Sequence, residues 1–164
     1  MKMKNILFIG FMGCGKSTLA RDFARESGRV FIDSDTLIEM QFNLSVSEIF
    51  ANFGEKTFRQ EEQKMAYFLA QLKGVCIATG GGFINVKDLD KIGFCVYLRA
   101  SFEYLKNRLN KEEIAKRPLF YEEEKARNLY NSRINLYEKK ANLILDIENQ
   151  SVESLIDELK KRIK

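Results

Sequence analysis

The sequence contains no histidine. This absence excludes Ser-His-Asp triads, histidine general bases and zinc sites built on histidine ligands. Any chemistry must therefore rest on lysine, arginine, aspartate, glutamate and backbone amides, together with a metal ion that the protein borrows.

Long apolar runs and paired cysteines are also missing. No run approaches the ~18 apolar residues that a membrane span needs, so we expect no membrane partner. Met1 to Ile9 is charged and then only briefly apolar, which is too short for a signal peptide and favours a buried strand. The three cysteines are odd in number and lack metal-like spacing, which predicts a cytoplasmic protein with reduced thiols.

The excess of charge of one sign is small. Lysine and arginine number 27 and aspartate and glutamate 23, which gives a net charge of +4. This excess suits an anionic small ligand. Because the basic residues are interleaved with acidic ones, we expect no nucleic-acid partner. We also expect the protein to be a monomer.

Five short apolar runs alternate with longer amphipathic segments. The runs are Asn5–Ile9, Val30–Ile32, Val75–Ala78, Phe94–Leu98 and Leu143–Leu145. They are continuous rather than alternating, which is typical of parallel strands buried on both faces. The segments with helical spacing are Lys16–Glu26, Glu55–Leu72, Ser101–Asn110, Glu122–Lys140 and Val152–Ile163, and Ser101 and Ser151 are candidate N-caps. The pattern predicts one α/β domain over residues 1–164, a three-layer sandwich with a five-stranded parallel sheet and helices on both faces.

The segment Asn110–Glu124 is charged and contains Pro118, the only proline of the chain. It has little to bury against a sheet, so we interpret it as a mobile lid between two helices. An ordinary surface loop is the alternative, and composition alone favours that alternative.

Residues 10–17 fit the P-loop pattern G-x-x-x-x-G-K-[ST]. The pattern follows an expected strand and opens an expected helix, which is the context that a P-loop requires. The glycines and the helix N-terminus form a nest for phosphate oxygens. We expect Lys16 to reach the β- and γ-phosphates of a nucleotide and Ser17 to bind Mg²⁺. The full set of candidate ATP-binding residues here is Gly13, Cys14, Gly15, Lys16, Ser17 and Thr18.

Two further motifs follow expected strands. Asp33 and Asp35 should face the P-loop, because ligands bind outside the carboxyl ends of parallel strands. One carboxylate could hold the Mg²⁺ shell and the other could accept a proton from a substrate hydroxyl. A helix N-cap is an equally good explanation of this motif. Gly80 to Gly82 would let backbone approach a ligand closely, where a tight turn needs fewer glycines.

Together these motifs resemble those of the shikimate kinase family. The resemblance rests on the P-loop, the D-x-D pair, Phe58-Arg59 with Glu62, the glycine run, Arg117-Pro118-Leu119, and Arg133 with Tyr137. It covers nearly the whole chain, to about Asp146, and the combination is far more specific than the P-loop alone.

The resemblance implies an ATP-dependent kinase that phosphorylates the 3-hydroxyl of shikimate with Mg²⁺ as cofactor. It implies that Asp33 orients Mg²⁺ and that Asp35 binds the substrate hydroxyls and serves as a candidate base. It also implies that Arg117 closes from the lid onto the transferring phosphate, next to Lys16. The implied substrate-binding residues are Asp35, Phe50, Phe58, Arg59, Gly80, Gly81, Gly82 and Arg133.

Chemistry agrees with these roles, since a carboxylate substrate suits planar, bidentate arginine. The alternative is that Arg59 and Arg133 are exposed helix residues, with Arg59 paired to Glu62 or Gln63. Two places depart from the family pattern. Where relatives place an arginine against adenine, this chain has Asn110, and Arg108 lies two residues earlier. The stretch Ile147–Ser151, which corresponds to the other adenine-contacting loop of the family, also matches poorly.

Two other functions compete. A gluconate or nucleoside-monophosphate kinase shares the P-loop and a lid, but the glycine run with Asp35 and Arg59 argues against it. A non-catalytic nucleotide switch would not need Asp35, Arg59, Arg133 and Arg117 together.

Overall fold

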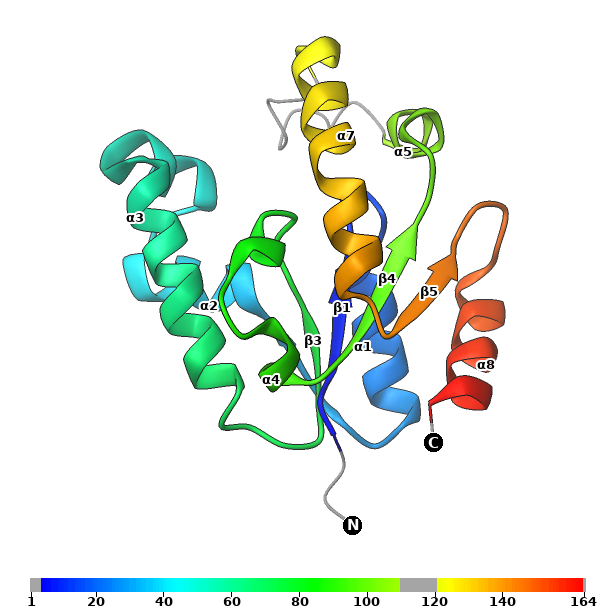
Figure 1. Ribbon diagram of the computed structural model, residues 1–164. Helices are drawn as coiled ribbons and strands as arrows, with labels where there is room; N and C mark the ends of the chain where they lie inside the picture. Colours follow the sequence, from blue (N-terminus) through cyan, green and yellow to red (C-terminus); the bar gives the residue numbers. More distant parts are fainter. Residues whose placement is uncertain (1–3, 110–120, 164) are drawn as a thin grey trace.

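A five-stranded parallel sheet organises the structure, in the order β2-β3-β1-β4-β5 (Figure 1). The computed structural model describes residues 4–109 and 121–163. The strands are β1 (Ile6–Ile9), β2 (Val30–Asp33), β3 (Val75–Ala78), β4 (Phe94–Arg99) and β5 (Leu143–Asp146). The predicted sheet is confirmed, and its strand bounds differ from the predicted ones by one residue at most.

The strands are not all buried on both faces, and this part of the prediction was wrong for the sheet edges. Strands β1 and β3 are completely buried. Strand β2 lies at one edge, where Val30 is 66% exposed, and Asp146 of the other edge strand is exposed. An edge strand lacks a neighbour on one side, so the helices cover it less completely.

Helices lie on both sides of this sheet (Figure 1). Helices α1 (Lys16–Glu26) and α8 (Val152–Arg162) pack together on one face, and α7 (Glu123–Lys140) covers β4 on the other. The short elements η1 (Phe83–Asn85) and α4 (Leu89–Ile92) follow β3, and α5 (Phe102–Arg108) follows β4. No helix in the described part of the chain has the length and apolar content of a membrane span.

The sequence pattern missed the short elements η1 and α4 and a longer helical region, α2 (Ser34–Phe42) with the first half of α3 (Val46–Leu69). Helix α3 contains a break at Gly54, whose φ of 81° is costly for other residues. The predicted helix from Glu55 corresponds to the part after this break. The part before it begins at a capping box in which Ser45 and Glu48 satisfy each other's backbone amides.

Other helix predictions are confirmed. Helix α1 has the predicted bounds, and the hydroxyls of Ser101 and Ser151 accept bonds from Tyr104 N and Ser154 N as N-caps. Of the expected lid, residues 110–120 lie outside the described part of the chain, while Glu123 and Glu124 form the first turn of α7.

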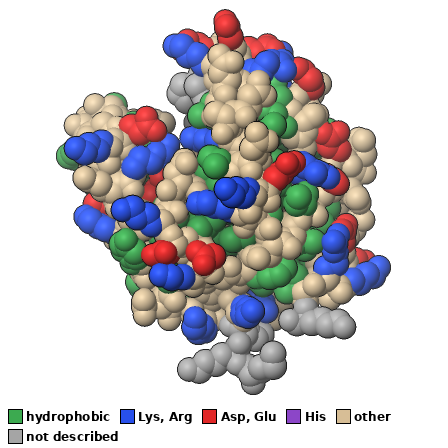
Figure 2. Space-filling model, in the orientation of Figure 1, with side chains coloured by type: hydrophobic (Ala, Val, Ile, Leu, Met, Phe, Trp, Pro, Cys, Tyr) green, Lys and Arg blue, Asp and Glu red, His purple; other side chains and the backbone are tan. Residues whose placement is uncertain are grey.

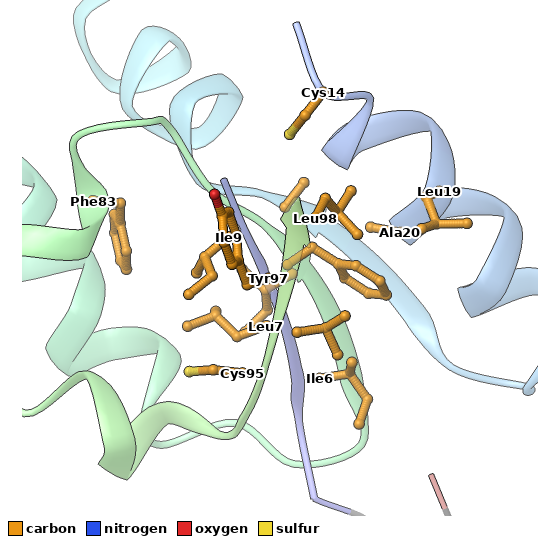
Figure 3. Packing of buried hydrophobic residues seen from close by; sticks show 14 of the residues in the cluster. Ile6, Leu7, Ile9, Cys14, Leu19, Ala20, Phe83, Cys95, Tyr97 and Leu98 are labelled. Carbon is orange, nitrogen blue, oxygen red and sulfur yellow. The ribbon is translucent and has the colours of Figure 1, made fainter. Parts of the chain in front are cut away.

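The core lies between the sheet and its helices. Figure 3 shows side chains of β1 and β4 directed to both sides of the sheet, with Tyr97 and Leu98 among them. At the end of the sheet where the strands begin, the buried amide of Asn5 ties the connection between α3 and β3 to the connection between α4 and β4. Its Nδ2 donates to the carbonyl oxygens of Leu69, Leu72 and Ile92 at 3.3, 2.9 and 2.9 Å, and its Oδ1 accepts from Val75 N at 3.3 Å.

Candidate active site

The P-loop connects β1 to α1 at the carboxyl edge of the sheet. Gly15, the N-cap of α1, has a φ of 88° and offers no side-chain acceptor, and the first turn of the helix contains no acidic residue. The first backbone N–H groups of α1 therefore remain available to an anion. The site is thus prepared for phosphate oxygens by backbone geometry alone.

Lys16 folds back over this loop. Its Nζ donates to the carbonyl oxygens of Gly10 and Phe11 at 2.9 and 3.0 Å, and lies 3.6 Å from Cys14 Sγ. The Cys14 side chain points from the loop toward the sheet and is buried (Figure 3). The ammonium group is therefore held at the mouth of the phosphate nest by acceptors that a phosphate could replace.

Asp33 combines the two roles that the sequence left open. Its Oδ1 accepts from the backbone N–H groups of Asp35 and Thr36 at 3.1 and 3.2 Å, which makes it the N-cap of α2. Its Oδ2 accepts a 2.6 Å bond from the hydroxyl of Ser17. The cap fixes the carboxylate beside the P-loop, so capping here also prepares a pair of hard oxygen ligands.

Asp35 lies deeper. Burial, together with the negative charges of Asp33 and Glu62, raises its pKa from 3.8 to about 7, although the charge of Lys16 acts in the opposite direction. Its Oδ1 is buried and has no hydrogen-bond partner among the described residues. A carboxyl group with a pKa near neutrality can exchange a proton with a substrate hydroxyl at physiological pH.

The glycine run after β3 faces three charged side chains. A Cβ at Gly80 would lie 2.6 Å from Asp35 Oδ1, and a Cβ at Gly81 would lie 3.2 Å from Arg133 Nη1. A Cβ at Gly82 would overlap the guanidinium of Arg59. None of the three glycines has a positive φ, so close approach rather than backbone conformation explains them.

Arg59 is held from both sides on α3. Its Nη1 donates to Glu62 Oε2 at 2.7 Å, and its Nε and Nη2 donate to Glu55 Oε1 at 3.2 and 2.9 Å. The pairing with Glu62 was foreseen, whereas Gln63 does not take part: its Oε1 accepts from Lys87 N instead. Glu55 was missed, although its spacing of four residues from Arg59 on a helix was a usable signal.

The two expected phenylalanines lie against this arginine. The rings of Phe50 and Phe58 are 4.9 Å apart, and the guanidinium carbon of Arg59 is 5.8 and 5.7 Å from their centroids. These distances allow cation–π attraction. Phe58 is buried and Phe50 half-buried, so they form an apolar wall that keeps the guanidinium at the glycine run.

Arg133 approaches from α7 and is also buried. The hydroxyl of Tyr137, one turn further along, donates a 2.6 Å bond to Gly81 O and interacts with Arg133. The Tyr137 ring stacks on Tyr97 at 5.1 Å. Arg133 is therefore not the exposed helix residue of the alternative interpretation.

Two adjoining cavities share the P-loop. One, of about 270 Å³, contains the predicted phosphate, metal and proton-transfer residues; its lining includes Gly13, Gly15, Lys16, Ser17, Thr18, Asp33, Asp35, Gly80 and Gly81. The other, of about 380 Å³, extends from Cys14, Gly15 and Thr18 toward Tyr104 and Gln150. The first fits phosphate groups and a polar acceptor, and the second is apolar enough for a flat base.

Arg108 lines both cavities, as Gly15 and Thr18 of the P-loop region do. Its Nη1 donates to Cys14 O at 3.3 Å, and a Cβ at Gly15 would lie 3.0 Å from its Nη2. Of the two candidates for contact with a base, Arg108 is thus at the cavity. Asn110 and the predicted catalytic Arg117 lie outside the described residues.

A P-loop beside a buried carboxyl group and two arginines defines a class, the P-loop phosphotransferases that act on small molecules. Comparison with known proteins makes the assignment specific. The shikimate kinase family model matches residues 12–164, and the chain belongs to the shikimate kinase family and is a kinase.

Individual relatives agree. The chain is 41% identical to the shikimate kinase of Helicobacter hepaticus, over 92% of this chain and 91% of the relative. It is 37% identical to that of Lactococcus lactis subsp. lactis, over 96% and 97%. A structure of the Acinetobacter baumannii shikimate kinase in complex with shikimate superposes with a TM-score of 0.89 at 31% identity, covering 98% of this chain and 93% of that one.

The competing interpretation as a gluconate kinase has weaker structural support. A gluconokinase from Sinorhizobium meliloti superposes with a TM-score of 0.58 at 16% identity. This similarity concerns the fold alone.

Proposed function

We propose that this chain transfers the γ-phosphate of ATP to the 3-hydroxyl of shikimate, giving shikimate 3-phosphate and ADP in the biosynthesis of aromatic amino acids. Family membership supports the reaction. The convergence of Asp35, Arg133 and Arg59 on Gly80–Gly82 beside the P-loop supports the acceptor. A carboxylate at one end and hydroxyls at the other are what such a pocket would recognise.

In the proposed mechanism the substrate carboxylate binds Arg59 and Arg133, and a hydroxyl approaches Asp35. Asp35 accepts the hydroxyl proton as the oxygen attacks the γ-phosphorus and the bond to the β-γ bridging oxygen breaks. Lys16 then stabilises the charge that develops on the transferring group. We propose the same role for Arg117.

Mg²⁺ fits the residues at the mouth of the P-loop. Ser17 Oγ and Asp33 Oδ2 are hard oxygen donors 2.6 Å apart. The described residues contain no cluster of three or more acidic, cysteine or histidine side chains that would hold a metal alone. That is the pattern for Mg²⁺, which takes one or two protein oxygens and completes its shell with water and nucleotide phosphates. When bound, it would neutralise phosphate charge; Ser17 and Asp33 would orient it.

We place the adenine of ATP in the larger cavity, against Arg108. A guanidinium plane can stack on a base, and this arginine already bridges the P-loop and the cavity. Arg108 would then replace the arginine that relatives have at the position of Asn110.

A coupled assay of ADP formation tests the function. Purified protein with MgATP should form ADP only slowly until shikimate is added. ADP formation at the same rate with and without shikimate would instead favour a nucleotide switch, and activity on gluconate or a nucleoside monophosphate would favour another kinase.

Calorimetry tests the acceptor site. Removing one arginine from a desolvated ion pair costs ~2–5 kcal/mol. Arg59→Ala or Arg133→Ala should therefore weaken shikimate binding at least about thirtyfold. ATP affinity should change little. Loss of ATP binding with shikimate binding intact would assign these arginines to the wrong half of the site.

We further propose a monomer in the cytoplasm. The cysteines Cys14, Cys76 and Cys95 are buried free thiols, which suits a reducing compartment. Light scattering of the purified protein tests the monomer.

A further inference from the structure

The guanidinium of Arg59 is already occupied by carboxylates in this structure. Its Nη1 is bonded to Glu62, whereas its Nε and Nη2 both donate to the same oxygen, Oε1 of Glu55. The Nε and Nη2 edge is one of the two faces with which arginine binds a carboxylate through parallel hydrogen bonds. Glu55 therefore occupies a position that a substrate carboxylate could take.

The two partners of Arg59 differ in burial. The side chain of Glu62 is 2% exposed, while that of Glu55 is 64% exposed. A buried carboxylate separated from its arginine would lose its hydrogen-bonded partner and keep only the more distant charge of Arg133, so we treat Glu62 as the permanent partner of Arg59. Glu55 would simply be hydrated by water, so exchanging it for another carboxylate costs little.

The backbone also favours an exchange. Glu55 directly follows the break at Gly54 and opens the second half of α3. A carboxylate released at the start of a helix remains stabilised by the partial positive charge of the exposed N–H groups. Glu55 therefore has a favourable position both on and off Arg59.

We propose that Glu55 is an internal competitor of the substrate: it holds the Nε and Nη2 edge of Arg59 in the free protein, and the substrate carboxylate displaces it on binding. The inference rests on the proposed function, because it requires Arg59 to bind the carboxylate. Glu55 keeps Arg59 oriented between turnovers and lowers the affinity for the substrate as a consequence.

The alternative is that Glu55 positions Arg59 while the substrate uses the remaining N–H groups of Nη1 and Nη2. The two roles predict opposite effects. Removal of a competitor tightens shikimate binding, whereas removal of a support weakens it.

The experiment measures the Kd of shikimate by calorimetry, and KM for both substrates, in the natural protein, Glu55→Gln and Glu55→Asp. Exposed ion pairs are weak, so we expect Glu55→Gln to bind shikimate about two- to fivefold more tightly. KM for shikimate should fall in parallel, with KM for ATP unchanged. Glu55→Asp keeps the charge but is one methylene shorter, so it should pair less well with Arg59 and should also bind shikimate more tightly than the natural protein.

Glu158→Gln is the matched control, since Glu158 pairs with Arg162 at the same spacing on α8, with an N–O distance of 3.0 Å. It should leave shikimate binding unchanged. Unchanged or weaker binding in Glu55→Gln overturns the proposal, and so does tightening in Glu55→Gln but not in Glu55→Asp, which would show a general charge effect. If the natural protein itself binds no shikimate, the proposed function has failed instead.

Discussion

The two ends of the sheet differ in how their buried polar groups are paired, although Nε of Arg29, just before β2, also has no hydrogen-bond partner among the described residues. Where the strands begin, Asn5 uses its whole amide in bonds to the α3–β3 and α4–β4 connections. Where they end, Ser34 Oγ, Asp35 Oδ1 and Glu62 Oε1 are buried with no hydrogen-bond partner in the described part of the chain. A buried polar atom without a partner costs ~1–3 kcal/mol. The first end thus stabilises the fold, and the second keeps atoms free for a ligand at some cost in stability.

The largest effect that this comparison predicts belongs to Lys16. Lys16→Ala should lower kcat by roughly a hundred- to a thousandfold, because a positive charge on the transferring phosphate acts mainly in the transition state. The free energy of unfolding should change little. Steady-state kinetics measure kcat, and urea unfolding measures the free energy of unfolding. Lys64→Ala, at an exposed lysine of α3, is the control. Near-normal kcat would remove Lys16 from the catalytic residues.

Asn5 should show the reverse pattern. Asn5→Ala leaves several buried backbone groups without their side-chain partner, so it should lower the free energy of unfolding by about 3 kcal/mol. In protein that remains folded, kcat and KM should stay near their natural values. Urea unfolding monitored by circular dichroism measures the change in the free energy of unfolding. Asn131→Ala, at an exposed position of α7, should be almost silent, and an equal loss there would contradict the contrast between the two ends.

The pH dependence of stability tests the buried carboxyl group of Asp35. Burial raises the pKa of Asp35 from 3.8 to about 7, so between about pH 4 and 7 the folded protein holds a proton that the unfolded chain has lost. The free energy of unfolding contributed by Asp35 therefore falls as pH rises through this window. Asp35→Asn removes this penalty, and the full rise in pKa from 3.8 to about 7 is equivalent to about 4 kcal/mol. The variant should therefore be at least about 2 kcal/mol more stable than the natural protein above pH 7, with no advantage near pH 4.

Urea unfolding of both proteins across this range measures the effect, with Asp157→Asn on the exposed side of α8 as control. A stability difference that is the same at every pH would disprove the assignment. Activity gives a second measurement: kcat/KM for shikimate in the natural protein should rise with pH through about 7, as the carboxylate forms.

The smallest effect is expected for the hydroxyl of Tyr137. Tyr137→Phe keeps the ring stacked on Tyr97 but loses the 2.6 Å bond to Gly81 O. KM for shikimate should rise about fivefold, equivalent to about 1 kcal/mol, with KM for ATP unchanged. Tyr130→Phe is matched, because that hydroxyl also donates to a carbonyl, Ala100 O at 2.9 Å. Equal KM changes in both variants would mean that Tyr137 has only a structural role.

The sequence predicted the sheet well because its central strands are short, continuous apolar runs bounded by glycines or polar residues. It missed α2, where apolar spacing is weak and where Asp33 belongs to the site and to a helix cap at once. It also missed the start of α3, although Val46, Ile49, Phe50 and Phe53 have helical spacing and Ser45 with Glu48 has the pattern of a capping box. Acidic and basic side chains are interspersed over the face shown in Figure 2, so charge patterning alone could not locate the site.

For the site, motifs identified residues but not their arrangement. That Gly80, Gly81 and Gly82 each face a different charged side chain follows from packing between three elements, which no spacing encodes. That Arg133 is buried depends on how α7 lies over β4. The helical pairs of Arg59 with Glu55 and with Glu62 can be read from spacing, but the difference in exposure between the two carboxylates cannot.

The glycine run also limits how the gene can change. A substitution at the first or second base of any glycine codon replaces glycine, and at Gly80 or Gly82 every replacement adds a carbon atom where Asp35 or Arg59 now lies. The fold could survive by moving those side-chain ends, but the pocket could not keep its shape. An inhibitor that depends on this turn would therefore leave the organism few escape mutations there.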